Sequence, residues 1–301
     1  KAEDAYGYIT ISTLPVTYKT IPGPSLTLTE STIFAGTDAK KGVPVQIESV
    51  RGVHEVVIYR IENGSEVEAL RETKNGEHTL NYAPEIDFTE ATSKLKVVVS
   101  DGREGKEAIG YMKAYVNMDV ATLNVGSQPL ANNAHVKYPD AFGMVSLNDL
   151  KTYSVDYAIA NEVNAKNVDF KFYCFGASGS PRLYSMDNTG KDGEFSGSTG
   201  KLSAIKVKNL TRFAILSNFD YENATVASIS SEILSSSIAQ SLLDPIAVGN
   251  VIAFRTGGSS AAGGGRIGVM KVINITEPKE LVSNNATARV MTVEIKFPKK
   301  K

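Results

Sequence analysis

The stretch from Val248 to Pro298 constrains the fold more than any other part of the chain, because it holds three strand-like runs in succession. These runs are rich in Val, Ile, Met and Phe, which favour strands. Residues 257–265, between the first two runs, are all Gly, Ser or Ala, a composition that turns a chain readily and cannot sustain a strand. In the third run every second position from Met291 to Phe297 is apolar, and Glu294 and Lys296 fall between them. The stretch predicts an antiparallel meander that closes a C-terminal domain, with one face of its last strand in water.

The composition of the chain argues against several classes of protein. With 301 residues, of which 42% are hydrophobic, the chain is long enough for two domains and apolar enough to pack their cores. A net charge of -1 argues against nucleic acid as a partner. No apolar run in the sequence approaches the roughly 18 residues that a membrane-spanning helix needs.

The single cysteine, Cys174, excludes a disulfide within the chain. It lies in the apolar run Phe170–Phe175, which predicts a buried free thiol. A catalytic cysteine would need a basic partner close in space, and the histidines His54, His78 and His135 are all distant from it in sequence. These residues form no transition-metal motif of recognisable spacing. We expect no metal centre and no cofactor.

Short alternating runs, each bounded by Gly, Asn or Pro, fill residues 5–117 and predict an all-β unit. The pairs Asn63-Gly64 and Asn75-Gly76 are strong signals for tight turns. About eight short strands in about 110 residues fit a β-sandwich, although the Cys…Trp…Cys signature of true immunoglobulin domains is absent because the chain has no Trp. We predict that residues 1–118 form an immunoglobulin-like β-sandwich. The expected strands are Tyr6–Ile11, Ser25–Thr29, Val43–Val50, His54–Ile61, Glu66–Leu70, His78–Tyr82, Leu95–Ser100 and Ala108–Val116.

Residues 119–301 mix strand-like and helical patterns, which predicts an α+β domain with an antiparallel sheet. A short helix is expected after Ser154, a candidate cap, with Val155, Ile159 and Val163 on its apolar face. Further strands are expected at Asp119–Gly126, Asp169–Phe175 and Arg182–Tyr184.

Two more helices are predicted nearer the C-terminus. The first is Leu210–Leu216. The second and longest is Asn223–Leu243, in which four apolar side chains fall on one face and Asp244-Pro245 provides the end. Those four side chains are Val226, Ile229, Ile233 and Leu234.

Five segments carry a resemblance to a known family: Thr152–Asn161, Val168–Gly176, Asn209–Leu216, Val248–Thr256 and Gly268–Ile275. In this order, and with a closing strand after them, they resemble the C-terminal domain of exported lipoproteins of Bacteroidetes. In those proteins an immunoglobulin-like domain commonly comes first. The resemblance covers most of residues 119–301, and the N-terminal half by fold type alone. Its motifs are structural, so it implies a fold and an address but supplies no catalytic motif.

Many proteins of this type have no assigned activity or are regarded as adhesins, and some are encoded near glycan-uptake systems. The resemblance implies an exported protein of the cell envelope or outer surface. Such proteins carry a lipidated cysteine near the mature N-terminus. This chain begins at Lys1 without Met and without that cysteine. We expect an export segment and a lipid anchor in the full-length form, and contact with a membrane only through that anchor.

Gly263–Gly268 matches the pattern G-x-G-x-x-G of dinucleotide-binding loops. Such a site needs the loop between a strand and a helix, so that the helix N-terminus faces the pyrophosphate. Here the strand-like run Val269–Ile275 follows, and we interpret the glycines as a hairpin tip. The chain contains no P-loop motif and no G-x-S-x-G elbow.

The segment Asp187–Glu194 is rich in oxygen donors, as calcium-binding loops are. Asp187, Asp192 and Glu194 are its candidate ligands. Lys191 falls where an EF-type loop would place a ligand, and we therefore favour a solvated turn over a calcium site.

Aromatic rings beside polar groups commonly bind sugars. Tyr138, Tyr184 and Tyr221 lie in or near predicted loops of the second domain and are the candidate ligand contacts, and Phe142 is in a similar position. The alternative for each ring is burial in the core. The lack of Trp also weakens the case for a carbohydrate-binding module.

No catalytic residue is assigned from the sequence. A carboxylate pair for glycoside hydrolysis would form only in the fold. We expect a non-catalytic, adhesin-like protein that binds an extracellular glycan or protein. The alternatives are a glycoside-active enzyme and a structural spacer or assembly subunit of a surface complex. The carboxylates available to such an enzyme are Glu55, Glu62, Asp156, Asp169 and Glu222.

Overall fold

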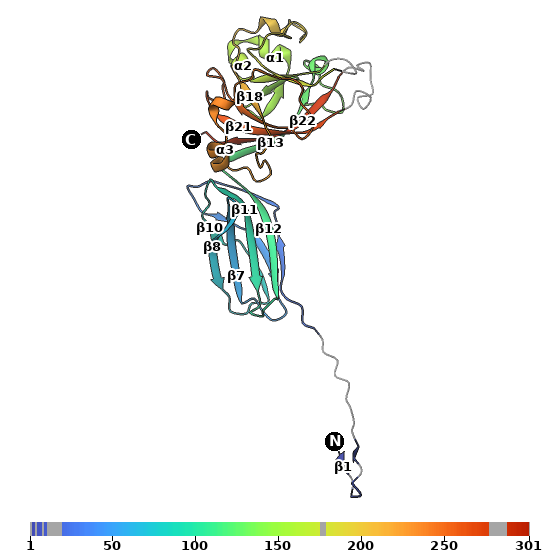
Figure 1. Cartoon of the computed structure of the whole chain (residues 1–301), viewed down its shortest axis with the longest axis vertical. Coiled ribbons are helices and arrows are strands. Elements are labelled where there is room, and N and C mark those ends of the chain that lie inside the picture. Colours follow the sequence, from blue (N-terminus) through green and yellow to red (C-terminus); the bar gives the residue numbers. More distant parts are fainter. Residues whose placement is uncertain are drawn as a thin grey trace.

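The structure is a computed structural model that describes residues 2–3, 5–7, 9–10, 20–174, 179–276 and 288–300. Strands make up 42% of it and helices 10%, so the predicted mostly-β fold is confirmed. Two sets of sheets follow one another along the chain and lie end to end in Figure 1. In the part of the chain that the structure describes, no helix is long and apolar enough to cross a membrane.

The first set of sheets is a sandwich. The smaller sheet has the order β3 (Ser25–Leu28), β6 (Val45–Glu48) and β9 (Thr79–Tyr82). The larger has the order β4 (Thr32–Ala35), β12 (Glu107–Val116), β11 (Thr92–Ser100), β7 (Glu55–Glu62) and β8 (Ser65–Thr73). Alternate side chains such as Ile47 and Val97 are buried between the two sheets. The order β12-β11-β7-β8 is that of strands G, F, C and C′ in an immunoglobulin domain.

Of the two tight turns predicted in the sandwich, the one at Asn63-Gly64 is present and the one at Asn75-Gly76 is not a hairpin turn. Asn63 and Gly64 join β7 to β8 with φ of 50° and 81°, the left-handed values of a two-residue hairpin turn. Gly76 also has a positive φ, 84°. However, the chain at Asn75-Gly76 passes from β8 into the other sheet and makes no hairpin. Strand β4, which runs parallel to β12, is absent from the predicted strands.

Short strand pairs lie outside these two sheets. Lys41–Gly42 (β5) pairs with Glu85–Ile86 (β10), and Ala2–Glu3 (β1) pairs with Ile9–Thr10 (β2). The predicted strand Tyr6–Ile11 is thus only partly described, since its residues 8 and 11 lie outside the described residues. Among the described strands, β2 pairs with β1 alone and with none of the sandwich.

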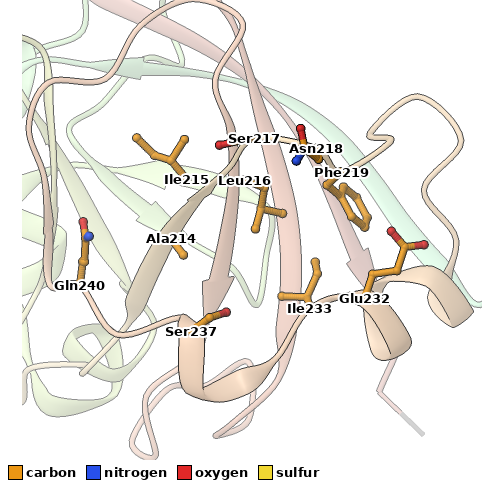
Figure 2. Close-up of a pocket in the computed structure, with 10 residues that line it drawn as sticks. All are labelled: Ala214, Ile215, Leu216, Ser217, Asn218, Phe219, Glu232, Ile233, Ser237 and Gln240. Atoms are coloured by element: carbon orange, nitrogen blue, oxygen red, sulfur yellow. The ribbon is translucent and has the colours of Figure 1, made fainter.

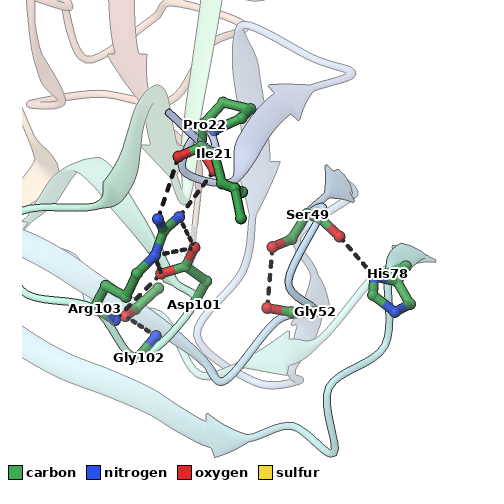
Figure 3. Close-up of polar contacts among 9 residues, drawn as sticks. Ile21, Pro22, Ser49, Gly52, His78, Asp101, Gly102 and Arg103 are labelled. Carbon is green, nitrogen blue, oxygen red and sulfur yellow. Dashed lines mark hydrogen bonds and ion pairs between the residues drawn. The ribbon is translucent and has the colours of Figure 1, made fainter. Parts of the chain in front are cut away.

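Arg103 fixes the chain where it enters the sandwich, at the end far from the second set of sheets (Figures 1 and 3). Its guanidinium donates to the carbonyl of Pro22 at 2.9 Å and pairs with Asp101. On the neighbouring turn, the Nδ1 atom of His78 lies 2.9 Å from the carbonyl oxygen of Ser49. These contacts tie the first described residues of the sandwich to its loops.

The second set consists of two five-stranded antiparallel sheets packed face to face. The first sheet has the order β13 (Met118–Gly126), β22 (Val290–Pro298), β21 (Ile267–Ile275), β20 (Val251–Arg255) and β18 (Arg212–Leu216). The second has the order β15 (Lys151–Tyr153), β14 (Met144–Ser146), β16 (Phe170–Tyr173), β17 (Arg182–Ser185) and β19 (Leu242–Leu243). A continuous cluster of buried apolar side chains, Phe170, Phe213 and Phe254 among them, fills the space between the sheets. The predicted antiparallel sheet is therefore present as two packed sheets.

Short helices cover the outer faces of these sheets (Figure 1). Helices α1 (Val155–Ala160) and α2 (Glu162–Lys166) pack on the second sheet, with Val155 buried. Helix α3 (Val226–Glu232) packs on the first sheet, with Ile229 buried. The short 3₁₀ turns of the described chain are η1 (Gln128–Leu130), η2 (Leu202–Ala204) and η3 (Ser235–Ser237).

The predicted C-terminal meander is confirmed, since β20, β21 and β22 are neighbours in one sheet. Its predicted wet face is confirmed only in part, because Thr292 and Glu294 are partly exposed but Lys296 is not. Lys296 is fully buried, and its Nζ atom donates to the carbonyl oxygens of Tyr221 and Glu222. The loop that carries these two residues and helix α3 cover this face of the sheet. Local alternation therefore identifies the strand but not what covers it.

Both of the later helix predictions are corrected by the structure. Leu210–Leu216 contains strand β18, because Phe213 and its neighbours pair with β20 instead of closing helical turns. Of Asn223–Leu243 only the seven residues of α3 are α-helical, and η3 adds one short 3₁₀ turn. The backbone becomes extended at Ile233, where a serine-rich segment follows, and Leu234 is 68% exposed instead of facing the core.

The capping role predicted for Ser154 is confirmed, since its side chain accepts a backbone hydrogen bond in the first turn of α1. Ile159 packs against the same cluster as Val155. Val163 is 75% exposed, contrary to the prediction. The reason is that α1 ends at Ala160 and a new cap at Asn161 starts α2 in another direction.

The two sets of sheets join at Asn117. Strand β12 ends at Val116, Asn117 has a φ of 50°, and β13 begins at Met118. Tyr115 and Met118, on either side of this residue, are buried in one cluster with helix α3. The end of the sandwich therefore packs against the second set of sheets.

Candidate functional site

The tyrosines predicted as ligand contacts do not meet at one site. Tyr184 and Tyr221 are 5% and 3% exposed and belong to separate apolar clusters. The hydroxyl of Tyr221 donates to the carbonyl of Glu294 at 2.7 Å, and burial raises the pKa of that phenol. Tyr138 is half-buried, and Phe142 lines a separate groove of about 430 Å³. Tyr184 and Tyr221 are thus core residues that offer no ring face to a ligand.

The candidate calcium ligands Asp187, Asp192 and Glu194 are each engaged with a cation of the chain. Asp187 accepts two hydrogen bonds of 2.8 Å from Arg212. Asp192 pairs with the buried Lys171 at 2.7 Å, and Glu194 pairs with the lysine three residues before it at 2.6 Å. In the described residues no group of three or more His, Cys, Asp or Glu side chains is placed to hold a metal. The segment is held as a turn by ion pairs.

The carboxylates considered for glycoside hydrolysis are scattered, and none of them lines either of the two grooves described below. Glu55 pairs with Arg71, and Glu222 pairs with Lys271. Asp156 accepts hydrogen bonds from a loop, which hold its pKa far below the usual range. The five carboxylates considered for glycoside hydrolysis are Glu55, Glu62, Asp156, Asp169 and Glu222.

Asp169 differs from the other four because it is fully buried. It accepts hydrogen bonds from the backbone N–H of Leu147 at 2.8 Å and from Ser260 at 2.6 Å. Burial raises its pKa to about 6, since the charged form loses its hydration. Ser260 lies in the glycine-rich tip between β20 and β21, so this carboxyl ties the tip to the second sheet.

Residues 263–266 lie in the predicted hairpin tip, and Ile267 and Gly268 begin strand β21. A Cβ atom on Gly268 would lie 2.4 Å from Phe254 Cζ and 2.7 Å from Phe297 Cδ2. Glycine is needed there for the packing of two rings, not for the approach of a phosphate.

Cys174 is the buried free thiol that the sequence predicts. Its sulfur donates to the carbonyl of Gly179 at 3.2 Å, and burial raises the pKa of the thiol. Because the thiolate is the nucleophilic form, this environment disfavours reactivity.

A groove of about 610 Å³ runs along the outer edge of strand β18 (Figure 2). We call it the β18 groove. One wall is β18 with the loop Ser217–Phe219, and the other is the end of α3 with the segment that leads to Gln240. Gln240 lies at one end of the groove, and Phe219 and Glu232 lie at the other (Figure 2).

The backbone of β18 is only partly paired on this side. Strand β18 is at the edge of its sheet and pairs with β20 on its inner side. On the outer side Phe213 exchanges two backbone hydrogen bonds with Gln240, of 2.8 and 3.1 Å. In an antiparallel pair the N–H and C=O groups alternate in direction, so those of Ile215 point to the same outer side. No described segment pairs with Ile215 there, because the chain before Gln240 diverges to form the groove.

The side chains of the β18 groove combine an apolar surface with a single charge. Leu216, Phe219 and Ile233 provide apolar surface, and Ile215 is 45% exposed. Glu232 is the one charged side chain among the lining residues, and it is exposed. The groove therefore presents unpaired backbone donors and acceptors, an apolar wall and one negative charge.

Sequence reasoning did not identify this groove. Its wall at β18 was predicted as helix, and its second wall was placed inside a longer helix. One signal was available: the serines at positions 230–231 and 235–237 favour caps and turns over a helix interior. The chain matches no family model and no curated protein sequence.

Proposed function

We propose that the protein is a non-catalytic binding protein of the cell envelope, which holds an extended segment of a partner protein along β18. The observation that carries the proposal is the edge of β18 at Ile215, where backbone groups face an open groove. Addition of a strand to such an edge is a common mode of peptide recognition, in which backbone hydrogen bonds supply affinity and alternate side chains supply specificity.

The groove also defines the chemistry of the partner. An added strand would place every second side chain against Leu216 and Ile233, which favours apolar residues at alternate positions. Glu232 at the end of the groove favours a lysine or arginine at one end of the bound segment. The volume of about 610 Å³ lies within the range of ligand sites.

The place of the protein in the cell is part of the proposal and rests on the resemblance to exported lipoproteins. Export and a lipid anchor remain predictions. We favour binding over glycoside chemistry because the carboxylates considered for catalysis are dispersed and engaged with neighbouring groups. An assembly role would use the same edge strand, with a second copy of the chain as the partner.

Peptide selection tests this proposal. A random peptide library displayed on phage is selected against the intact chain, and synthetic copies of the enriched peptides are titrated by calorimetry. We expect alternating apolar peptides with a basic residue at one end. Methylation of those backbone nitrogens that face β18 should abolish binding, whereas methylation at the intervening positions should not.

Variants of the protein provide the matched control. Ile215→Pro removes one outward N–H group without loss of a bond to β20, because that N–H faces the groove. It should weaken peptide binding at least tenfold, the effect of about 1.4 kcal/mol, whereas Ile215→Val should not. Strand addition would be contradicted if Ile215→Pro bound the peptide as tightly as the unaltered chain does. It would also be contradicted if peptides methylated on the two sets of nitrogens bound with equal affinity. Sedimentation without peptide tests the assembly role, because self-association lost in Ile215→Pro would identify a second copy as the partner.

A further inference from the structure

A second cavity lies where the sandwich meets the second set of sheets, and its volume is about 480 Å³. We call it the junction cleft. The sandwich contributes the turn at Asn63 and the start of β11 at Lys94. The other wall consists of the loop that carries Asp220 and Asn223 and of helix α3 down to Glu232.

The two walls are fixed to each other by contacts around the cleft. The backbone N–H of Ala227 in α3 donates to the carbonyl of Glu90 at 3.1 Å. The side chain of Asn117 donates to the carboxylate of Glu90, also at 3.1 Å. Lys113 of β12 lies 3.5 Å from the carboxylate of Glu222. The cleft is therefore formed before any ligand binds.

Most of the residues that line the cleft are polar, and they include both signs of charge. Lys94 is cationic, and Asp220 and Glu232 are anionic. Asn223 donates to Asp220 from its side chain at 2.7 Å and from its backbone at 3.2 Å, and these bonds lower the pKa of Asp220. The side-chain oxygen of Asn223 is buried and accepts no hydrogen bond.

We propose that the junction cleft binds a neutral saccharide. Each hydroxyl of a sugar both donates and accepts hydrogen bonds, which matches a wall that offers the ammonium of Lys94 beside the carboxylates of Asp220 and Glu232. An anionic ligand would meet the two carboxylates of this cleft, and a cationic ligand would meet Lys94. The site is distinct from the β18 groove, with which it shares only Glu232.

Titration of the intact chain with sugars tests the assignment. The probes are neutral di-, tri- and tetrasaccharides of glucose, galactose, mannose, xylose and N-acetylglucosamine, followed by NMR on isotopically labelled protein. At least one should give a saturable shift of the Asn223 side-chain amide, with a Kd in the micromolar to low millimolar range. Absence of saturable shifts with every probe in that range would overturn the proposal.

Two variants locate the site. Lys94 and Asp220 line the junction cleft and not the β18 groove. Lys94→Gln and Asp220→Asn should each lower the affinity for the sugar at least tenfold, since hydrogen bonds to charged groups are worth about 1.5–3 kcal/mol. Lys106→Gln, an exposed lysine at the far end of the sandwich, is the matched control and should bind as the unaltered chain does. Equal affinity in all three variants would place the sugar elsewhere and overturn the proposal. Ile215→Pro, which should weaken peptide binding at β18, should leave sugar binding unchanged, so that the two proposals fail separately.

Discussion

Replacement of Lys296 by methionine tests how the end of the sandwich is held against the second set of sheets. The Lys296 ammonium lies 4.3 Å from the centre of the Tyr221 ring and 5.5 Å from that of Tyr115, which belong to the two sides of the junction. No carboxylate within the described residues forms an ion pair with it. Burial lowers its pKa to about 8, and the nearby charge of Lys113 acts in the same direction.

The sign and size of the effect follow from linkage. An ordinary lysine has a pKa of 10.5, so between pH 8 and pH 10.5 the unfolded chain binds a proton that the folded chain does not. The free energy of unfolding therefore rises with pH across this window, and the destabilisation by the buried charge is complete below it. At 1.36 kcal/mol per pKa unit, Lys296 alone contributes a rise of about 2.5 kcal/mol from pH 7 to pH 10. Hydrogen bonds from Asn223 and Lys271 lower the pKa values of the neighbouring carboxylates Asp220 and Glu222, so both stay ionised throughout.

The assay is urea unfolding followed by far-ultraviolet circular dichroism at several pH values between 7 and 10. The unaltered chain is compared with Lys296→Met, so that titration of tyrosines cancels in the difference. We expect the stability of Lys296→Met relative to the unaltered chain to fall by about 2.5 kcal/mol over this range. Lys271→Met, a partly exposed lysine on the adjacent strand, should show no such change. Parallel curves for the unaltered chain and Lys296→Met would refute the account of a desolvated lysine.

Three further substitutions test separate parts of the fold. Thr225→Ala removes the side chain that caps α3 at 3.0 Å and should lower the free energy of unfolding by about 1–2 kcal/mol in a urea titration. Gly268→Ala should lower Tm markedly, because its Cβ would lie 2.4 Å from a phenylalanine ring, whereas Gly258→Ala, with nothing within 4 Å, should leave Tm nearly unchanged. Arg103→Ala should speed hydrogen exchange at the backbone N–H of Gly23, because the chain that enters the sandwich loses its bond to Arg103. Equal exchange rates in Arg103→Ala and Arg103→Lys would contradict the role of Arg103 in fixing this segment.

The strands could be predicted where the pattern is local. The alternation in residues 290–297 specifies one strand, and the run of Gly, Ser and Ala at residues 257–265 specifies a tip, without knowledge of the rest of the chain. The burial of Lys296 could not be predicted in this way. It depends on a loop around Tyr221 that lies far away in sequence and supplies two carbonyl acceptors to the ammonium.

The groove and the cleft depend on contacts that no local pattern encodes. Leu210–Leu216 is too short for its period to distinguish a helix from a buried strand, and pairing with β20 decides the outcome. The β18 groove exists because the chain before Gln240 diverges from β18. Tyr184 lies in strand β17 and Tyr221 in a loop, and packing buries both. Position relative to predicted loops was therefore a poor guide to exposure.

Glu232 gives the two proposed sites a means to influence each other, because it lines both the β18 groove and the junction cleft. A sugar that hydrogen-bonds this carboxylate would weaken its attraction for a basic peptide. Linkage then requires that bound peptide lower the affinity for the sugar by the same factor. We expect a decrease of about fivefold in the affinity of a basic peptide at saturating sugar, at the low end of typical coupling free energies of about 1–3 kcal/mol. Glu232→Gln should remove the coupling and leave the affinity of neutral peptides unchanged. Peptide affinity that is independent of sugar in the unaltered chain would show that the carboxylate is not shared.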